Sequence, residues 1–249
     1  MILTVPKNLG LFLLALAIGP VVAIYTSVLP GRAQDGSDVR PPICEPTGTP
    51  GEVKCNYGET ADNYIGQFAN GLPNGRGIFV YANGDRYEGL FRNGRPNGQG
   101  VFIFADDTRY EGVFEQGVIV QGKVIYPSGD RYEGEFEIVR NIGTDVRSSQ
   151  PHGRGQFVFA NGDRYVGEFF AGQPFGNGVF SRPDGTRCQG EFFNENLDGE
   201  GTCTFPNGVR YEGELRGGIP HGNGTLIDPN GRRFPGVFRE GQPFSPGEN

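Results

Sequence analysis

Arginine, histidine, carboxylate and cysteine side chains recur in this chain at positions where they could bind ligands or do chemistry. Arginine directly precedes an aromatic residue or a cysteine at seven regularly spaced places. Guanidinium groups bind oxyanions with two parallel hydrogen bonds, so a row of them would suit a phosphate or a lipid headgroup. The candidate contacts for a headgroup or a partner are Arg86, Arg109, Arg131, Arg164, Arg187 and Arg210.

The glutamates near these arginines favour a different role. A glutamate follows four of the arginines after two residues, as Glu88 follows Arg86. Side chains two residues apart in a strand project from the same face, so each pair neutralises itself. The pattern therefore indicates charge ladders on a solvated face more strongly than it indicates an anion site.

The other polar residues predict no catalytic centre. His152 and His221 each stand in a Pro-His-Gly turn where other parts of the chain have Pro-Asn-Gly. Acidic pairs such as Asp106 and Asp107 stand in turns, where Asp bonds to the local backbone. The sequence contains no nucleophile elbow, phosphate loop or metal motif. We therefore predict a protein without enzyme activity, cofactor or bound metal.

The four cysteines are disulfide candidates. Cys44 and Cys55 flank a Pro- and Gly-rich segment and are predicted to form one bridge. Cys188 and Cys203 replace core residues of one repeat, so they either form a second bridge or remain small buried side chains. They are poor metal candidates, because no CxxC or Cys/His cluster accompanies them.

A periodic backbone must position all these residues. The chain has 43 glycines and 19 prolines, a content that suggests disorder unless the residues recur with a period. Here a tyrosine or its substitute is followed by Gly two residues later and by a mainly aromatic residue four residues later. The repeats start at Tyr64, Tyr87, Tyr110, Tyr132, Tyr165, Cys188, Tyr211 and Phe234, with spacings of 23, 23, 22, 33, 23, 23 and 23 residues.

Each repeat predicts two strands, because runs rich in Tyr, Phe, Val and Ile alternate with Asn-Gly and Pro-Asn-Gly turns. Gly89 lies between Tyr87 and Phe91 and leaves a socket on their face. A ring from the next strand, Phe102 or Phe104, is expected to cover that socket. The predicted repeat core comprises Tyr64, Gly66, Phe68, Tyr87, Gly89, Phe91, Tyr110, Gly112, Phe114, Tyr132, Gly134, Phe136, Tyr165, Gly167, Phe169, Tyr211 and Gly213.

The segment YEGEF, an NG or PNG turn, a GxG pair and an aromatic strand ending in NGDRY resemble the membrane occupation and recognition nexus (MORN) repeat. The resemblance covers residues 64–249. It implies an all-β fold, an elongated single-layer antiparallel meander of about seven to eight β-hairpin repeats. MORN arrays occur as accessory segments of lipid kinases, as membrane tethers and as cytoskeletal scaffolds, so the resemblance implies binding or spacing and no reaction.

Two segments depart from the repeat. Residues 117–122 (GVIVQG) replace the usual Gly, Pro, Asn and Gly with a less polar hairpin end, and residues 137–150 interrupt the fourth repeat. Insertions in repeat proteins map to loops on one side of the array, often the binding side. We predict that a local site, if the protein has one, lies at these segments; for 137–150 a solvent loop without function is the alternative.

The chain divides into three predicted regions. Residues 1–33 contain an apolar run, Leu9 to Leu29, which is either a cleaved signal peptide or a signal anchor. Residues 34–63 are a Pro/Gly-rich linker with a capping strand expected at Tyr57 to Asn63, and residues 64–249 form the array. The array is therefore predicted to lie outside the cytoplasm, in the cell envelope, the periplasm or the extracellular space.

The net charge of −7 disfavours nucleic acid and anionic membranes as partners. The first predicted function is an extracytoplasmic scaffold that binds a protein partner or a second copy of itself, because the aromatic rows of a single-layer sheet need cover. The alternative is a phospholipid-binding module at a membrane surface that uses the arginine row. Wall-glycan binding through the tyrosine rows is a third, weaker reading, supported by aromatic content alone.

Overall fold

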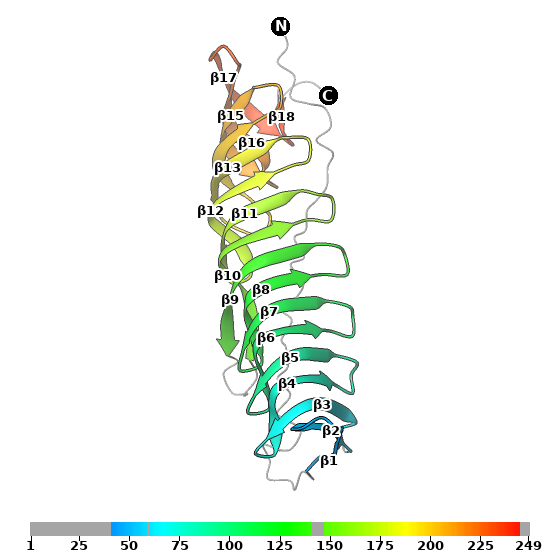
Figure 1. The fold of residues 1–249 in the computed structure, drawn as a ribbon. Coiled ribbons are helices and arrows are strands. Elements are labelled where there is room, and N and C mark those ends of the chain that lie inside the picture. Colours follow the sequence, from blue (N-terminus) through cyan, green and yellow to red (C-terminus); the bar gives the residue numbers. More distant parts are fainter. Residues whose placement is uncertain (1–40, 59, 141–146, 245–249) are drawn as a thin grey trace. The chain divides into compact units, whose positions relative to one another are not determined.

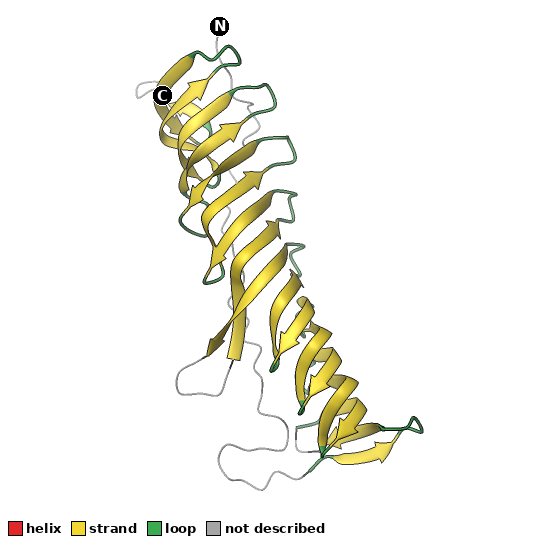
Figure 2. Cartoon of the chain, turned by 60° about the vertical axis from the view of Figure 1, so that its left-hand side comes forward, coloured by secondary structure: helices red, strands yellow, loops and turns green. Residues whose placement is uncertain are grey.

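The computed structural model describes residues 41–58, 60–140 and 147–244 of the 249-residue chain. Eighteen strands are found there, and strands adjacent in sequence pair in an antiparallel meander (Figures 1 and 2). This arrangement confirms the predicted fold class. The expected signal or anchor, residues 1–33, lies outside the described residues and stays a prediction. The part of the chain that is described contains no helix long and apolar enough to cross a bilayer.

The chain divides into two compact units, which meet in sequence at Gln150 and Pro151 within β10. The strands of the N-terminal unit are β1 (Ile43–Pro46), β2 (Glu52–Tyr57), β3 (Asp62–Ala69), β4 (Leu72–Val80), β5 (Arg86–Arg92), β6 (Arg95–Ile103), β7 (Arg109–Glu115), β8 (Val118–Ile125) and β9 (Arg131–Arg140). Those of the C-terminal unit, which begins within β10, are β10 (Arg147–Val158), β11 (Arg164–Phe170), β12 (Gln173–Ser181), β13 (Arg187–Phe192), β14 (Gly199–Thr204), β15 (Arg210–Arg216), β16 (Ile219–Ile227), β17 (Arg233–Arg239) and β18 (Gln242–Phe244).

Two kinds of turn connect the strands. Asn93 and Gly94 both have positive φ, 50° and 79°, the geometry of a type I′ turn whose twist matches that of the flanking strands. At the other end of the hairpin, the Gly84 N–H donates to the Tyr81 carbonyl at 3.0 Å, with Gly84 at φ 94°. Glycine takes this left-handed position because it has no Cβ. These turns fix the strand register that the sequence left open.

Hydrogen bonds at both ends of the hairpins join each repeat to the next. The N–H of the turn glycine Gly94 donates to the Pro73 carbonyl of the preceding repeat at 2.8 Å. At the opposite edge, the Asp85 carboxylate accepts the Ala105 N–H at 2.9 Å. The Pro, Gly and Asp positions of the repeat therefore hold the hairpins together along the array.

Tyrosine and phenylalanine side chains of one face form the core. Tyr87 lies opposite Phe102 in the ladder, and its ring meets Phe91 and Phe114 edge-on at centroid distances of 5.0 and 5.1 Å. Such geometry suits the quadrupoles of aromatic rings. All six tyrosines of the predicted core are buried, and so are its phenylalanines except the half-buried Phe68.

The glycine sockets are filled by a different ring from the one predicted. A Cβ added at Gly100 would lie 2.2 Å from the hydroxyl oxygen of Tyr87. Tyr87, and neither Phe102 nor Phe104, therefore covers the socket, because its ring leans along its own strand over the glycines. The Tyr87 hydroxyl donates to the Leu90 carbonyl at 3.0 Å, which holds the ring in place.

A hairpin precedes the first repeat, within the segment predicted as a linker. Cys44 of β1 lies opposite Cys55 of β2, and the two form a disulfide with Cα atoms 4.0 Å apart. The capping strands are thus β1 and β2, whereas the expected strand at Tyr57 to Asn63 contains the turn before β3. The linker was predicted from the turn-rich composition of this segment. The predicted Cys44–Cys55 disulfide, which joins the two strands, received less weight.

The two aperiodic segments are accommodated in different ways. Val118 and Ile119 are fully buried, because Ile119 lies opposite Phe114 where other repeats place proline. Val118 and Ile119 therefore belong to the core, whereas Val120 is half-buried and Gln121 is exposed. The insertion lengthens the hairpin of β9 and β10, where Gln150 donates to Glu137 at 2.5 Å. Residues 141–146 of the insertion lie outside the described residues.

Candidate functional site

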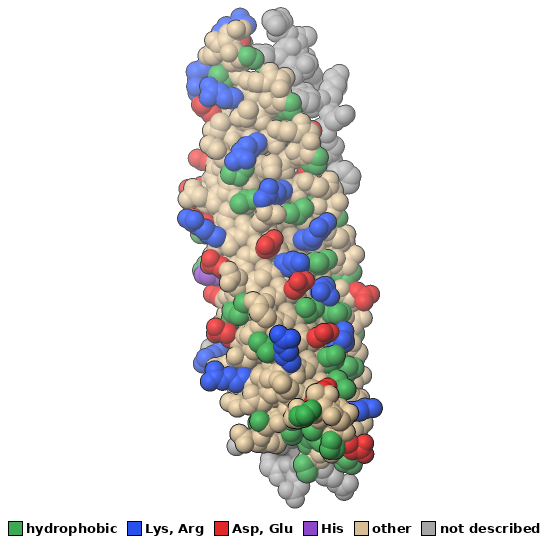
Figure 3. All heavy atoms as spheres, viewed as in Figure 1, with side chains coloured by type: hydrophobic (Ala, Val, Ile, Leu, Met, Phe, Trp, Pro, Cys, Tyr) green, Lys and Arg blue, Asp and Glu red, His purple; other side chains and the backbone are tan. Residues whose placement is uncertain are grey.

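The face opposite the aromatic core carries the candidate site of the N-terminal unit. Across β5, β6 and β7 the ladder places Glu88, Val101 and Glu111 in one row of this outer face. The apolar side chain of β6 thus lies between charged side chains of β5 and β7. On the face shown in Figure 3, basic, acidic and hydrophobic side chains are likewise interspersed. The sequence prediction treated this face as polar, because it considered only the first strand of each repeat.

Ion pairs occupy part of the arginine row. The guanidinium of Arg86 lies 2.7 Å from the Glu88 carboxylate, and that of Arg109 lies 3.4 Å from Glu111. Lys123 approaches Glu111 to 3.3 Å, and its hydrogen bond is the main reason that the pKa of Glu111 lies below its usual value. These contacts confirm two of the four predicted Arg–Glu pairs.

The remaining arginines of the row are exposed. The Glu212 carboxylate pairs at 2.8 Å with Arg233 of the next repeat, although the sequence predicted a pair with Arg210. The Arg164 guanidinium donates to the side chain of Gln156. The exposed arginines are Arg131, Arg164, Arg187 and Arg210.

A groove of about 730 Å³ crosses the outer face over β2 to β7. Paired glycines contribute to its lining, with Gly66 opposite Gly77 and Gly89 opposite Gly100. The apolar side chains that line it are those of Pro50, Ile65, Ile78, Leu90 and Val101. Ile65 and Leu90 are 39% and 36% exposed, so a bound segment could cover them.

Three polar side chains of the groove, those of Gln67, Glu88 and Glu111, are already bonded within the chain. The Gln67 side chain accepts the Arg76 N–H at 2.8 Å, while Glu88 and Glu111 are held by basic side chains. Carboxylates in ion pairs are poorly suited to proton transfer near neutral pH. Within the described ranges, no group of three or more His, Cys, Asp and Glu is placed to hold a metal ion. The contact surface that the groove offers is therefore that of its apolar side chains.

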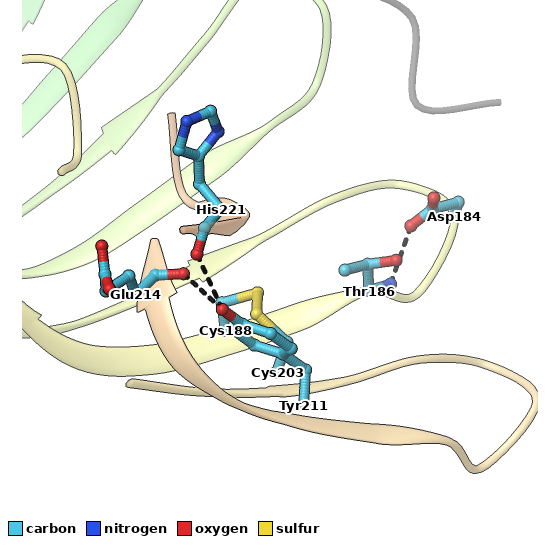
Figure 4. Close-up of a disulfide and its surroundings, with 7 residues drawn as sticks. All are labelled: Asp184, Thr186, Cys188, Cys203, Tyr211, Glu214 and His221. Carbon is cyan, nitrogen blue, oxygen red and sulfur yellow. Dashed lines mark hydrogen bonds between the residues drawn. A yellow bond between two sulfur atoms is a disulfide. The ribbon is translucent and has the colours of Figure 1, made fainter. Parts of the chain in front are cut away.

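A second disulfide lies in the C-terminal unit. Cys188 of β13 and Cys203 of β14 stand opposite each other with Cα atoms 4.0 Å apart (Figure 4). In the next strand, the Tyr211 hydroxyl donates to the carbonyls of Glu214 and His221 at 2.8 and 2.9 Å. The predicted Cys44–Cys55 bridge is confirmed, and of the two alternatives for Cys188 and Cys203 the structure has the bridge. Two disulfides fit an oxidising environment.

A family model for the MORN repeat matches this chain. The matched segments are residues 64–86, 87–109, 146–164, 165–187, 188–210 and 211–232, together more than half of the chain. The chain belongs to the MORN repeat family. Between the second and third matched segments lie residues 110–145, which contain the third repeat and the first part of the fourth.

Similar proteins were found among solved structures, whereas no curated protein matches the chain. The TCP10 domain of Danio rerio CPAP is 18% identical, with a TM-score of 0.33, over 74% of this chain and 78% of that one. The TCP domain of Drosophila melanogaster SAS-4, in complex with a proline-rich motif of Ana2, is 13% identical, with a TM-score of 0.39, over 83% and 96%.

An exposed aromatic cluster in the C-terminal unit was missed by the sequence analysis. Phe170, Phe175 and Phe193 are 58%, 50% and 51% exposed. The MORN repeat that starts at Tyr87 has Arg92 and Asn97 at the positions of Phe170 and Phe175. Both substitutions can be read in the sequence. The sequence analysis considered repeats of irregular length and did not consider single residues that face outward.

The prediction that the two histidines lie in turns is wrong: His152 lies in β10 and His221 in β16, because the glycine after each takes positive φ within a strand. The ring of His152 lies 5.7 Å from that of Phe170. Burial, together with the positive charges of Arg216 and Arg239, holds the pKa of His221 below its usual value. His221 is therefore neutral at physiological pH. Its backbone carbonyl accepts a hydrogen bond from the Tyr211 hydroxyl.

Proposed function

We propose that this MORN protein is an exported, non-catalytic interaction module that binds a protein partner along the groove over β2 to β7. The observation that carries the proposal is the groove itself, which presents Ile65, Ile78 and Leu90 beside polar groups already bonded within the chain. Apolar side chains of a partner segment would cover these three residues without breaking the bonds of Gln67, Glu88 and Glu111.

Burial of the aromatic rows favours a separate partner over a second copy of the chain. Self-association was expected because these rows need cover. Tyr87, Phe91 and Phe114 are at most 4% exposed within one chain, so the rows are already covered. A partner therefore finds contact area on the outer face.

Phospholipid binding through the arginine row has less support. A phosphate at Arg86 or Arg109 would first have to displace a glutamate from its ion pair. The net charge of −7 also opposes approach to an anionic membrane. Four exposed arginines keep this alternative open to a direct test with anionic vesicles.

The location outside the cytoplasm is part of the proposal. It is supported by the apolar run from Leu9 to Leu29 and by the two disulfides. Disulfides persist in secreted and periplasmic proteins and are rare in reducing compartments.

Two matched variants test the groove. Leu90 lies in the groove and Val80 lies outside its lining, yet both are outer-face residues with similar exposure, 36% and 40%. Partners are identified by proximity labelling with the exported protein, and their affinities are measured for L90R and V80R. Loss of a buried leucine contact should weaken binding about tenfold or more in L90R, with little change in V80R.

Two results would refute the groove as the binding site. One is an equal loss of affinity in both variants. The other is a protein that captures no partner but co-sediments with anionic vesicles at low salt, which would support the phospholipid alternative.

A further inference from the structure

The C-terminal unit has a second outer surface that the groove does not explain. Phe170 ends β11, Phe175 lies in β12, and Phe193 directly follows β13. The rings of Phe170 and Phe175 have centroids 5.9 Å apart. The ladder pairs Gly176 with Phe192, so the next position places Phe175 beside Phe193. The three half-exposed rings thus form one cluster on three neighbouring strands.

A row of glutamates lies next to this cluster. Glu191 of β13 is opposite Glu200 of β14, which is opposite Glu214 of β15. All three side chains are exposed, and Glu191 precedes Phe193 by two residues, so both project from the same face. Like charges directly opposite each other destabilise a sheet. Glu214 has a structural role, because it accepts hydrogen bonds from the backbone N–H and the side-chain amide of Asn223, both at 3.0 Å. The adjacent like charges of Glu191 and Glu200 bring the sheet no such advantage.

The same row carries a single glutamate across β6 to β9 of the N-terminal unit. There Gln99 lies opposite Val113, and Gln121 lies opposite Glu135. The MORN repeat thus tolerates uncharged residues at these positions. Three consecutive glutamates beside three exposed rings are a feature of this part of the chain and are not required by the fold.

The last repeat shows which group such a ring can accept. Phe244 holds the repeat position of Phe175, and Arg239 holds that of Phe170. The Arg239 guanidinium lies 4.1 Å from the centroid of the Phe244 ring, a cation–π contact. In the repeat of Phe170 and Phe175 the arginine is replaced by a second ring. That repeat therefore presents aromatic faces without the cation that Arg239 supplies in the last repeat.

We propose that the aromatic–acidic patch, formed by Phe170, Phe175, Phe193, Glu191 and Glu200, binds a basic segment of a partner protein. Arginine or lysine side chains of that segment lie over the phenyl rings and pair with the glutamates. Charge complementarity selects this occupant. A second copy of this chain carries a net charge of −7, and a phosphate group would be repelled by the same carboxylates.

Binding of a defined probe to the full exported chain tests the proposal. The probe is a fluorescent peptide of alternating arginine and leucine, read by anisotropy at about 150 mM salt. Peptides with glutamine or glutamate in place of arginine are the controls. Saturable binding is expected for the arginine peptide alone, and it should weaken as salt rises.

Variants that restore residues of the regular repeat locate the binding site without disturbing the fold. F170R and F175N introduce the residues found at Arg92 and Asn97, and each should weaken binding about tenfold. E191Q combined with E200Q should weaken binding and flatten its salt dependence. E133Q, an exposed glutamate on the outer face of the N-terminal unit, should leave the affinity within about twofold.

Several outcomes would overturn the proposal. These are the absence of saturable binding, equal binding of the glutamine peptide, unchanged affinity in both phenylalanine variants, or an equal loss in E133Q. Dimerisation in light scattering that F175N abolishes would instead assign the patch to contact between copies. L90R in the groove should leave the affinity for the peptide unchanged, so failure of the groove and failure of this patch are distinguishable.

Discussion

Replacing Gly167 with alanine should destabilise the C-terminal unit strongly, although alanine is the better residue for a strand interior. An added Cβ would lie 2.5 Å from the Tyr165 hydroxyl, 2.6 Å from the Gly178 Cα and 2.7 Å from the Asn177 carbonyl oxygen. The last two are backbone atoms of β12, so β11 and β12 must move apart. Overpacking costs about 1–3 kcal/mol or more, against about 0.5–1 kcal/mol gained by removing glycine. We expect a net loss of about 2 kcal/mol.

Gly236 provides a matched control in the same unit. It holds the same position in the last repeat, and a Cβ there would meet only Phe238, at 3.9 Å. G236A should therefore raise the free energy of unfolding by up to about 0.5–1 kcal/mol. The assay is urea unfolding followed by circular dichroism, with midpoints compared at a constant m-value.

A double-mutant cycle with Tyr165 separates the ring from the backbone. At Gly178 the three nearest atoms to an added Cβ all belong to Tyr165, at 2.4 to 2.5 Å. Y165L should thus rescue G178A by about 1–2 kcal/mol and rescue G167A less, because the backbone clash remains there. The reasoning fails if G167A costs no more than G236A, or if Y165L rescues both alanine variants equally.

Three further predictions concern pH, the disulfide and the turns. Burial raises the pKa of Tyr57 and of Tyr126 to about 12, so these tyrosines ionise at lower pH in the unfolded chain than in the folded one. Their contribution to stability should be fully present below pH 10 and fall between pH 10 and 12; melting temperatures that stay constant over this window would contradict this. C188Y combined with C203F restores an aromatic pair and should make the protein less sensitive to reductant than the wild type, which loses about 2–4 kcal/mol per reduced bridge; equal sensitivity in urea titrations would argue against it. D85A removes the carboxylate that accepts the Ala105 N–H at 2.9 Å and should lower the free energy of unfolding by about 1 kcal/mol. D85N keeps an acceptor oxygen and should lower it less; equal losses in the two variants would contradict this role.

Most strands and the Asn-Gly turns of this fold could be predicted because their signals are local. The predicted Pro-Asn-Gly turn is wrong, since Pro96, Asn97 and Gly98 lie within β6. A single Asn-Gly pair, such as Asn93 and Gly94, dictates a turn and thereby the strands on either side. The ring that fills the glycine socket could not be predicted in the same way. Tyr87 and Phe102 share a face, and the choice between them depends on how a ring leans along its strand, which the pattern of residues does not contain.

The candidate site was harder to predict than the fold, because it requires rows that cross several strands. Glu88 and Val101 are thirteen residues apart in sequence but lie opposite each other in the sheet. The groove appears only when the second strand of each hairpin is placed beside the first. The irregular segment 117–122 drew attention as a site, yet Val118 and Ile119 face inward, because the departure from the repeat replaced one core residue with another.

Inner and outer positions of the repeat are constrained very differently. On the inner face, Tyr165, Gly167 and Gly178 interlock at van der Waals limits, so a change at one of them requires a change at the others. On the outer face, the positions beside the hairpin turn have no such neighbours, and the chain places residues as different as Arg92 and Phe170 there. Specific binding can therefore evolve at these outer positions without loss of stability. We therefore expect single outward substitutions to mark binding sites in this chain better than changes in repeat length do.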